Sequence, residues 1–191
     1  LPSGTIWATR NVGASSPEDY GDYFAWGETE PKSYYDWDTY KWCNGSYYKL
    51  TKYCTSGDPA FEGDYGPIDN KTELEPEDDA AYVNLGANWR MPSYDQIVEL
   101  CYNCTWTWTT HNGVYGQLVT GSNGNTMFLP AAGSRDGGSL YDAGACGRYW
   151  SRTLQSWFPC YAYHIDLDSG KLDNWFFGRG YGFPVRAVRV S

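Results

Sequence analysis

The chain has 191 residues, a formal net charge of -9 and a sequence pI of about 4.6. The length fits one domain with a full core, and the acidic balance excludes nucleic-acid phosphates as the main target. Aromatic residues make up 18% of the chain, which excludes a disordered composition, and no apolar run approaches the roughly 20 residues of a membrane helix.

The first 54 residues are predicted to contain a short strand, a short helix and a long irregular segment. Residues 5–9, which read Thr-Ile-Trp-Ala-Thr, are predicted to form the strand. Ser16 and Pro17 precede two acidic residues, a pattern typical of a helix N-terminus. Residues 30–54 are polar and aromatic without a clear period. We therefore expect a long ordered segment without regular secondary structure there, which we call the excursion.

The six cysteines occur in an acidic, Trp- and Tyr-rich chain, which fits an exported protein. Cys43 and Cys54 bracket a segment that a disulfide could close, and two buried free thiols are the alternative. The chain begins without Met, so we expect it to be the C-terminal part of a longer exported protein, with an anchoring or pilin segment upstream.

Residues 58–79 are strongly acidic. Carboxylates of this density could form a calcium site, although the spacing of an EF-hand is absent. The alternative is a solvated acidic loop that leads into a short helix. Acidic residues stabilise the N-terminus of such a helix, and Gly86 would end it. The acidic residues are Asp58, Glu62, Asp64, Asp69, Glu73, Glu75, Glu77, Asp78 and Asp79.

The best-marked helix begins after Ser93. Ser93 and Gln96 have the spacing of a capping box, in which each side chain bonds the backbone of the other. Apolar residues then recur at helical spacing and predict one buried face. We therefore interpret two of them as core thiols and not as a redox pair. The apolar positions are Ile97, Leu100, Cys101 and Cys104.

Three strands are predicted next, over residues 105–109, 114–120 and 126–130. Asn112-Gly113 and Asn123-Gly124 are tight-turn dipeptides between them. Residues 131–138 are predicted to be a glycine-rich loop without the lysine of a phosphate-binding loop. Residues 185–190 are predicted to form the last strand.

Between these strands, residues 161–168 and 172–177 are predicted to form a hairpin around a turn at Ser169-Gly170. The first of these strands alternates, which indicates that one of its faces is buried. Residues 154–158 and 175–183 carry large aromatic side chains on a loop-like, glycine-rich backbone. Such a composition is typical of a binding surface, and aromatic filling of a core is the alternative.

Catalytic and metal-binding patterns are sparse. The chain has two histidines, His111 and His164, and no nucleophile elbow. Its carboxylates are plentiful, but none stands in an apolar setting that would tune it as an acid. We therefore expect neither an enzyme nor a bound cofactor, with calcium as the one alternative.

An ordered series of motifs carries a resemblance over essentially the whole chain. It resembles the "Fibrobacter succinogenes major" paralogous domains of bacterial surface proteins, which are similar to the formylglycine-generating-enzyme branch of the C-type lectin fold. The motifs are Gly4-Thr-Ile-Trp-Ala-Thr-Arg-Asn11, Tyr23-Phe-Ala-Trp-Gly27, Asn88-Trp-Arg-Met-Pro92, Phe128-Leu-Pro-Ala-Ala-Gly-Ser-Arg135, Gly147-Arg-Tyr-Trp-Ser151 and Gly182-Phe-Pro-Val-Arg-Ala-Val-Arg189.

The resemblance implies that residues 1–191 form a single C-type-lectin-like ligand-binding domain of the α+β class. Its twisted, mostly antiparallel sheet would come with two helices and long loops. The first and last strands would lie side by side, so that residues 6–8 pair near residues 185–190.

The chain also resembles the variable proteins of diversity-generating retroelements, which display ligand-binding residues on this fold. The resemblance implies that residues 147–183 form the variable binding surface. Mutagenesis of Asn codons cannot produce Gln155, Trp157, Lys171 or Trp175, so these would be fixed or encoded otherwise. The implied ligand-binding residues are Arg152, Leu154, Ser156, Trp157, Phe158, Tyr161, His164, Asp173, Trp175, Phe177, Arg179, Tyr181 and Phe183.

Together these inferences predict a ligand-binding or adhesion module on a bacterial outer membrane or at the tip of an appendage. Its partner would be a protein or glycan on another cell, a phage or a host surface. One alternative is an oxidase of the formylglycine-generating type, which would need Cys146 and Cys160 as reactive thiols. Another is a structural or pilin module without a ligand. The nearest match to a calcium-dependent sugar-binding triplet is Glu75-Pro76-Glu77, whose third residue departs from that pattern.

Overall fold

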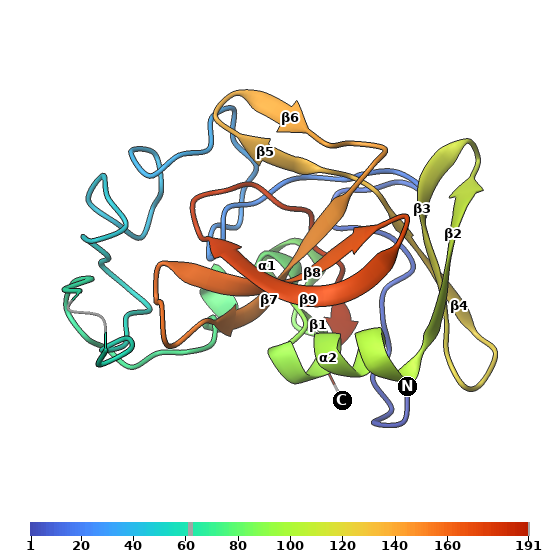
Figure 1. Cartoon of the computed structure of the whole chain (residues 1–191), viewed down its shortest axis with the longest axis horizontal. Helices are drawn as coiled ribbons and strands as arrows, with labels where there is room; N and C mark the ends of the chain where they lie inside the picture. Colours follow the sequence, from blue (N-terminus) through green and yellow to red (C-terminus); the bar gives the residue numbers. More distant parts are fainter. Residues whose placement is uncertain (61–62, 191) are drawn as a thin grey trace.

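Short strands and long loops dominate the chain, as its glycine-rich composition indicates. The computed structural model describes residues 1–60 and 63–190 (Figure 1). The helical elements are the 3-10 helix η1 (Pro76–Asp78) and the α-helices α1 (Ala80–Leu85) and α2 (Tyr94–Asn103). The strands are β1 (Trp89–Arg90), β2 (Thr105–His111), β3 (Val114–Thr120), β4 (Thr126–Pro130), β5 (Ser134–Asp136), β6 (Ser139–Tyr141), β7 (Gly147–Leu154), β8 (Tyr161–Asp168), β9 (Lys171–Gly178) and β10 (Val188–Arg189). The α+β class is therefore confirmed.

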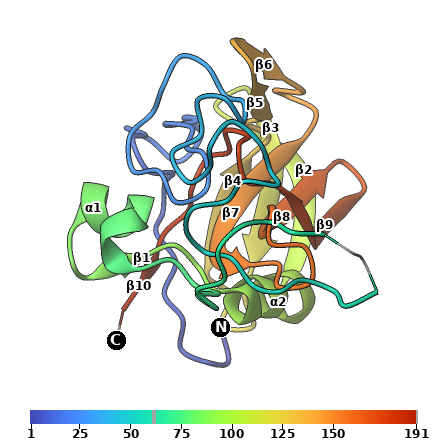
Figure 2. The ribbon, with the colours of Figure 1, turned by 90° about the vertical axis from the view of Figure 1, so that its left-hand side faces the viewer.

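The strands pair antiparallel in four small sheets, in the orders β1-β10, β2-β3-β4, β5-β6 and β7-β8-β9. In Figure 1 the β7-β8-β9 sheet lies at the centre, with α2 below it and the β2-β3-β4 sheet to its right. Figure 2 looks onto the left-hand side of the view in Figure 1, where the loops that precede α1 lie in front of β7. The single twisted sheet that the resemblance implies is thus divided among several short sheets.

The two ends of the chain lie side by side, as the resemblance implies. Trp7 forms an antiparallel bridge with Val188, and the Ala8 amide donates to the Ala187 carbonyl at 2.9 Å. The pairing predicted for residues 6–8 is therefore confirmed. Both strands are shorter than predicted, because residues 5–9 form only that bridge and β10 has two residues.

Helix α2 forms as predicted, because its N-terminal signal is local. Ser93 accepts a hydrogen bond from the Gln96 amide, and Gln96 accepts one from the Ser93 amide. Ile97, Leu100 and Cys101 are buried against the β7-β8-β9 sheet. Burial raises the pKa of the Cys101 thiol to about 12, as expected of a core thiol.

The acidic segment is less solvated than predicted. The short helix α1 does follow it, and Gly86 ends that helix as expected. Asp78 and Asp79, however, are buried. Asp79 caps α1 by accepting from the Ala81 amide at 2.9 Å, and it pairs with Arg90 Nε at 2.7 Å. Hydrogen bonds and ion pairs thus compensate the burial of these carboxylates. Glu62, which was grouped with these acids, lies outside the described residues.

The helix predicted near Ser16 does not form. The Asp19 carboxylate accepts hydrogen bonds from the backbone amides of Ser15 and Gly21 at 3.0 and 3.3 Å, which folds the segment into turns. Gly21 has a φ of 68°, and the stretch before it is too short for helix nucleation. Residues 30–54 form the long excursion that was predicted, without a helix or an extended strand, and their β-pairing is limited to isolated bridges from Tyr35 to Gly137 and from Cys43 to Leu50.

Three predictions about strands need correction. Residues 131–138 are not all loop, because β5 and β6 form a hairpin there. The strand predicted over residues 172–177 is confirmed in β9, so the loop-like backbone expected for residues 175–183 begins only after Gly178. Strand β8 is buried on both faces, since Ala162 packs in one core cluster and Ile165 and Leu167 pack in the other.

The described residues contain no helix that is long and apolar enough to cross a membrane. All six cysteines are free thiols, which decides between the two interpretations of Cys43 and Cys54. Both side chains are buried, as that alternative predicted.

Candidate ligand-binding surface

The β8-β9 hairpin places two large aromatic rings at the edge of the central sheet. Trp175 lies opposite His164, and Phe177 lies opposite Ala162. Alternate residues of a strand share a face, so Trp175 and Phe177 point the same way. Their side chains are 59% and 39% exposed. Because β9 is an edge strand, these rings stand at the boundary with solvent.

Neighbouring rings extend this surface around the edge of the sheet, since Phe176 stands on the face of β9 opposite to Trp175 and Phe177. The Phe177 and Tyr181 ring centroids are 4.7 Å apart, and Trp175 stacks on Phe176 at 5.1 Å. Phe176 lies 5.7 Å from Tyr161. Such offset and tilted contacts stabilise aromatic pairs beyond their buried area. The hairpin and the segment after it therefore present a connected aromatic cluster.

A second group of aromatic rings comes from the long excursion. The centroids of Trp37 and Tyr47 are 6.0 Å apart, and those of Tyr47 and Tyr48 are 4.0 Å apart. Tyr48 stacks on Tyr65 at 5.8 Å. Tyr47 and Tyr48 are both exposed. We did not predict these residues as part of the site, because the excursion has no period that shows which side chains face outward.

The two groups meet around a pair of glycines. A Cβ atom at Gly178 would lie 3.0 Å from the Tyr181 ring and 3.5 Å from the Trp37 ring. A Cβ atom at Gly180 would lie 3.6 Å from Trp37. Glycine at these positions thus permits close approach of the excursion to the segment after β9.

The pKa of Tyr161 supports the proximity of the excursion to the segment after β9. Burial raises the pKa of the Tyr161 phenol, and Cys160, Tyr181 and Tyr48 raise it further. Phe158 lies 6.2 Å from Tyr161, and Trp157 precedes it in the chain. The aromatic surface is defined here as Trp37, Tyr47, Tyr48, Trp157, Phe158, Tyr161, Trp175, Phe176, Phe177 and Tyr181.

Trp157 stands on a loop that is fixed by backbone contacts. The Asp58 amide donates to the Trp157 carbonyl at 2.8 Å, and Thr55 Oγ1 donates to the Ser156 carbonyl at 2.6 Å. The Trp157 amide in turn donates to Gln155 Oε1 at 2.8 Å. The indole side chain is nevertheless 55% exposed. The loop therefore presents a large ring from a constrained backbone.

Four predicted contact residues are buried, and those predictions are wrong. Leu154, His164, Arg179 and Phe183 all lie in the interior. Leu154 and Phe183 belong to the hydrophobic core, and His164 lies against Trp150 and Phe183. Arg179 lies beneath the aromatic surface, where its guanidinium bonds to backbone carbonyls. A ligand on the surface cannot reach these side chains.

Two further predicted residues are held by contacts within the protein. Arg152 donates to Glu73 Oε2 at 3.1 Å and to the Met91 carbonyl at 2.9 Å, away from the aromatic surface. Asp173 is exposed, but it accepts a hydrogen bond from the Tyr102 hydroxyl of α2 at 2.8 Å. We retain Ser156, Trp157, Phe158, Tyr161, Trp175, Phe177 and Tyr181 as candidate contacts.

The charged side chains next to the aromatic surface form ion pairs with one another. The Arg148 guanidinium lies 5.8 Å from the Phe177 ring centre, and its Nε lies 3.6 Å from Asp166 Oδ1. Lys171 Nζ also pairs with Asp166, at 2.5 Å, and this bond raises the pKa of the lysine. The arrangement favours apolar and stacking contacts with a ligand over a contact with one strong charge.

The thiols and acids offer little reactive chemistry. Burial raises the pKa values of Cys146 and Cys160, the latter to about 11, which lowers the thiolate fraction of both. No group of three or more His, Cys, Asp or Glu residues is placed to hold a metal ion within residues 1–60 and 63–190.

Comparisons with known proteins add no relative. No family model, curated protein or solved structure matches this chain. The interpretation of the aromatic surface therefore depends on its own geometry.

Proposed function

We propose that this protein is a ligand-binding or adhesion module and that the aromatic surface forms its contact area. The observation that supports this proposal is that two segments distant in the sequence bring exposed and half-buried aromatic rings together. A soluble protein exposes such a patch at a cost in solubility, so the patch favours a binding role. Trp and Tyr are also the residues that most often dominate binding energy at interfaces.

The support beneath the surface is consistent with this role. The rings stand on a hairpin that packs against α2 and on loops whose carbonyls Arg179 binds. A backbone that is already ordered loses little entropy when a ligand binds, which strengthens binding for a given contact area.

We further propose that the fold is of the C-type lectin type and that the module stands on a bacterial surface or appendage tip. Its ligand would be a protein or glycan on another cell, a phage or a host. The net charge of -9 disfavours nucleic acid. Diversification by a retroelement would act on exposed positions of residues 147–183. We also propose that binding needs no metal, so EDTA should leave it unchanged.

The test is binding of fluorescent tetramers of the protein to intact cells from the native habitat. A variant with Tyr48→Ala, Trp157→Ala and Trp175→Ala should lose binding by at least about tenfold, because it removes three exposed rings. The matched control is Tyr115→Ala, which removes an exposed ring of β3 outside this surface. Equal binding by the triple variant and the wild type, with both folded by circular dichroism, would contradict the proposal.

The oxidase alternative makes a different prediction. It requires reactive Cys146 and Cys160, whereas the raised pKa values of both thiols favour slow reaction. We expect iodoacetamide to label neither residue quickly in the native protein, as measured by peptide mass spectrometry. Rapid labelling of both cysteines at neutral pH would support the oxidase alternative instead.

A further inference from the structure

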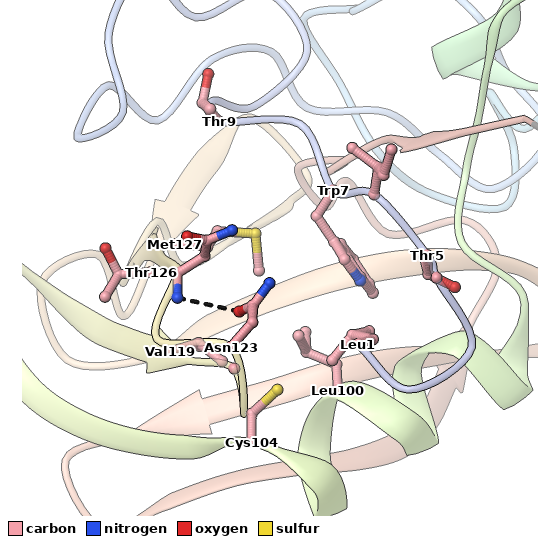
Figure 3. Close-up of a pocket in the computed structure, with 14 residues that line it drawn as sticks. Leu1, Thr5, Trp7, Thr9, Leu100, Cys104, Val119, Asn123, Thr126 and Met127 are labelled. Carbon is pink, nitrogen blue, oxygen red and sulfur yellow. Dashed lines mark hydrogen bonds between the residues drawn. The ribbon is translucent and has the colours of Figure 1, made fainter.

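A second candidate site lies away from the aromatic surface, near the start of the chain. It is a cavity of about 510 Å³ between the first nine residues, the end of α2 and the β3-β4 hairpin (Figure 3). In Figure 1 this region lies at the lower right, beside the N-terminus, whereas the long loops lie at the left. The volume is within the range of small-molecule sites in proteins.

The floor of the cavity is apolar. Trp7, Leu100, Val119 and Met127 line it, and they belong to or pack against the core cluster that also contains part of α2. Ile6 adds an apolar side chain that is 55% exposed. A ligand with an apolar body would remove this surface from water, which is favourable in proportion to the area buried.

The rest of the lining is polar but uncharged. Thr5, Thr9, Asn123 and Thr126 contribute hydroxyl and amide groups, and Asn123 accepts from the Asn125 amide at 3.0 Å. None of the lining residues that the structure describes has a charged side chain, although charged residues make up 19% of the chain. This composition disfavours an ionic ligand, because no lining side chain could balance its charge.

One donor at this site lacks a partner. The Trp7 indole Nε1 is enclosed and makes no hydrogen bond within the described part of the chain. An indole N–H can only donate, and leaving a donor unpaired away from water costs about 1 to 3 kcal/mol. Leu1 and Trp7 both line the cavity, as Figure 3 shows, so a ligand that displaces the half-buried Leu1 side chain would gain access to the Trp7 ring.

We infer that this cavity binds a small neutral molecule with a cyclic or branched apolar body and one carbonyl or hydroxyl oxygen. The apolar body packs on Leu100, Val119 and Met127. The oxygen accepts a hydrogen bond from Trp7 Nε1, and Thr and Asn side chains at the rim bind any further polar groups. This site is independent of the proposed adhesive function.

The test is an NMR titration of the ¹⁵N-labelled protein with cyclohexanone, a neutral ring with one acceptor oxygen. The Trp7 indole cross-peak is assigned by its loss in Trp7→Phe, which keeps an aromatic ring and removes the donor. We expect that cross-peak and the amides of Val119 and Met127 to shift together and to saturate. Trp7→Phe should weaken binding about tenfold, and Trp108→Phe, a matched change of a ring outside the cavity lining, should not.

A charged analogue and a blocking variant complete the test. Cyclohexylammonium has a similar ring with a cation in place of the ketone, and it should cause no saturable shift at Trp7. Thr126→Trp should fill the mouth and abolish the cyclohexanone response. The inference is overturned if cyclohexanone causes no saturable shift at these residues. It is also overturned if Trp7→Phe binds as tightly as the wild type, or if the cation binds equally well.

Discussion

His164 shows how strongly burial changes the role of a residue that sequence reasoning places at a surface. Its Nδ1 lies 3.0 Å from the Ile165 carbonyl, which fixes Nδ1 as the protonated nitrogen. Its Nε2 is buried without a hydrogen-bond partner in the part of the chain that the structure describes. Desolvation therefore lowers the pKa of the imidazole to about 4, although Asp166 and the Ile165 carbonyl raise it.

This shift predicts acid sensitivity. Below about pH 6.5 the unfolded chain binds a proton at His164 that the folded protein excludes, so stability falls as pH falls and levels off near pH 4. The loss should amount to about 3 kcal/mol. His164→Phe should remove this part of the pH dependence, as measured by urea unfolding at several pH values. An unchanged pH profile in His164→Phe would show that other groups cause it.

Arg179 is the second residue whose role the structure changes. Its guanidinium donates to the carbonyls of Lys52, Tyr53 and Pro159 at 2.8 to 2.9 Å and to the Tyr40 hydroxyl at 3.1 Å. It thus holds a segment of the excursion against the loop before β8.

Replacing Arg179 by Lys should lower the free energy of unfolding by about 2 to 4 kcal/mol, because one ammonium cannot satisfy four acceptors in this planar arrangement. The matched change Arg189→Lys, at an exposed position, should have little effect. Chemical denaturation of both variants measures the difference, and equal stability would show that the buried hydrogen bonds contribute little.

At the scale of secondary-structure elements, Asp79 connects α1 with β1 and the residue after it, a role that the pattern of charges in the sequence does not reveal. Its carboxylate caps α1, accepts from the Met91 amide beyond β1 and pairs with Arg90. Asp79→Ala should therefore cost about 3 kcal/mol of stability. Asp95→Ala, which removes an exposed acid from the first turn of α2, should cost less than about 1 kcal/mol. A loss as small as that of Asp95→Ala in thermal unfolding would refute the role of Asp79.

Elements with local signals could be predicted from the sequence. The capping box at Ser93 and the turns at Asn112-Gly113 and Ser169-Gly170 depend on neighbouring residues, and each formed where expected. The helix expected at Ser16 failed because the Asp19 side chain bonds the backbone in turns. Burial of both faces of β8 depends on packing partners distant in the sequence, which alternation within one strand cannot show.

At the scale of the whole molecule, the candidate binding surface joins parts that are distant in sequence. Trp157, Trp175 and Phe177 could be predicted, because they lie in the aromatic-rich last quarter. Tyr47 and Tyr48 could not, since only tertiary contacts bring the excursion beside β9. Similarly, the buried state of Arg179 depends on carbonyls that the sequence does not place near it.

We propose that residues 147–183 combine a fixed framework with an exposed surface that varies among copies of the gene to suit a ligand. The most direct measurement is deep sequencing of their codons in a population of the source organism. The account predicts variation at exposed or half-exposed positions such as Ser156, Tyr161, Asn174 and Phe177, with constant codons for His164, Arg179 and Phe183. A uniform segment, or equal variation at the buried positions, would contradict it.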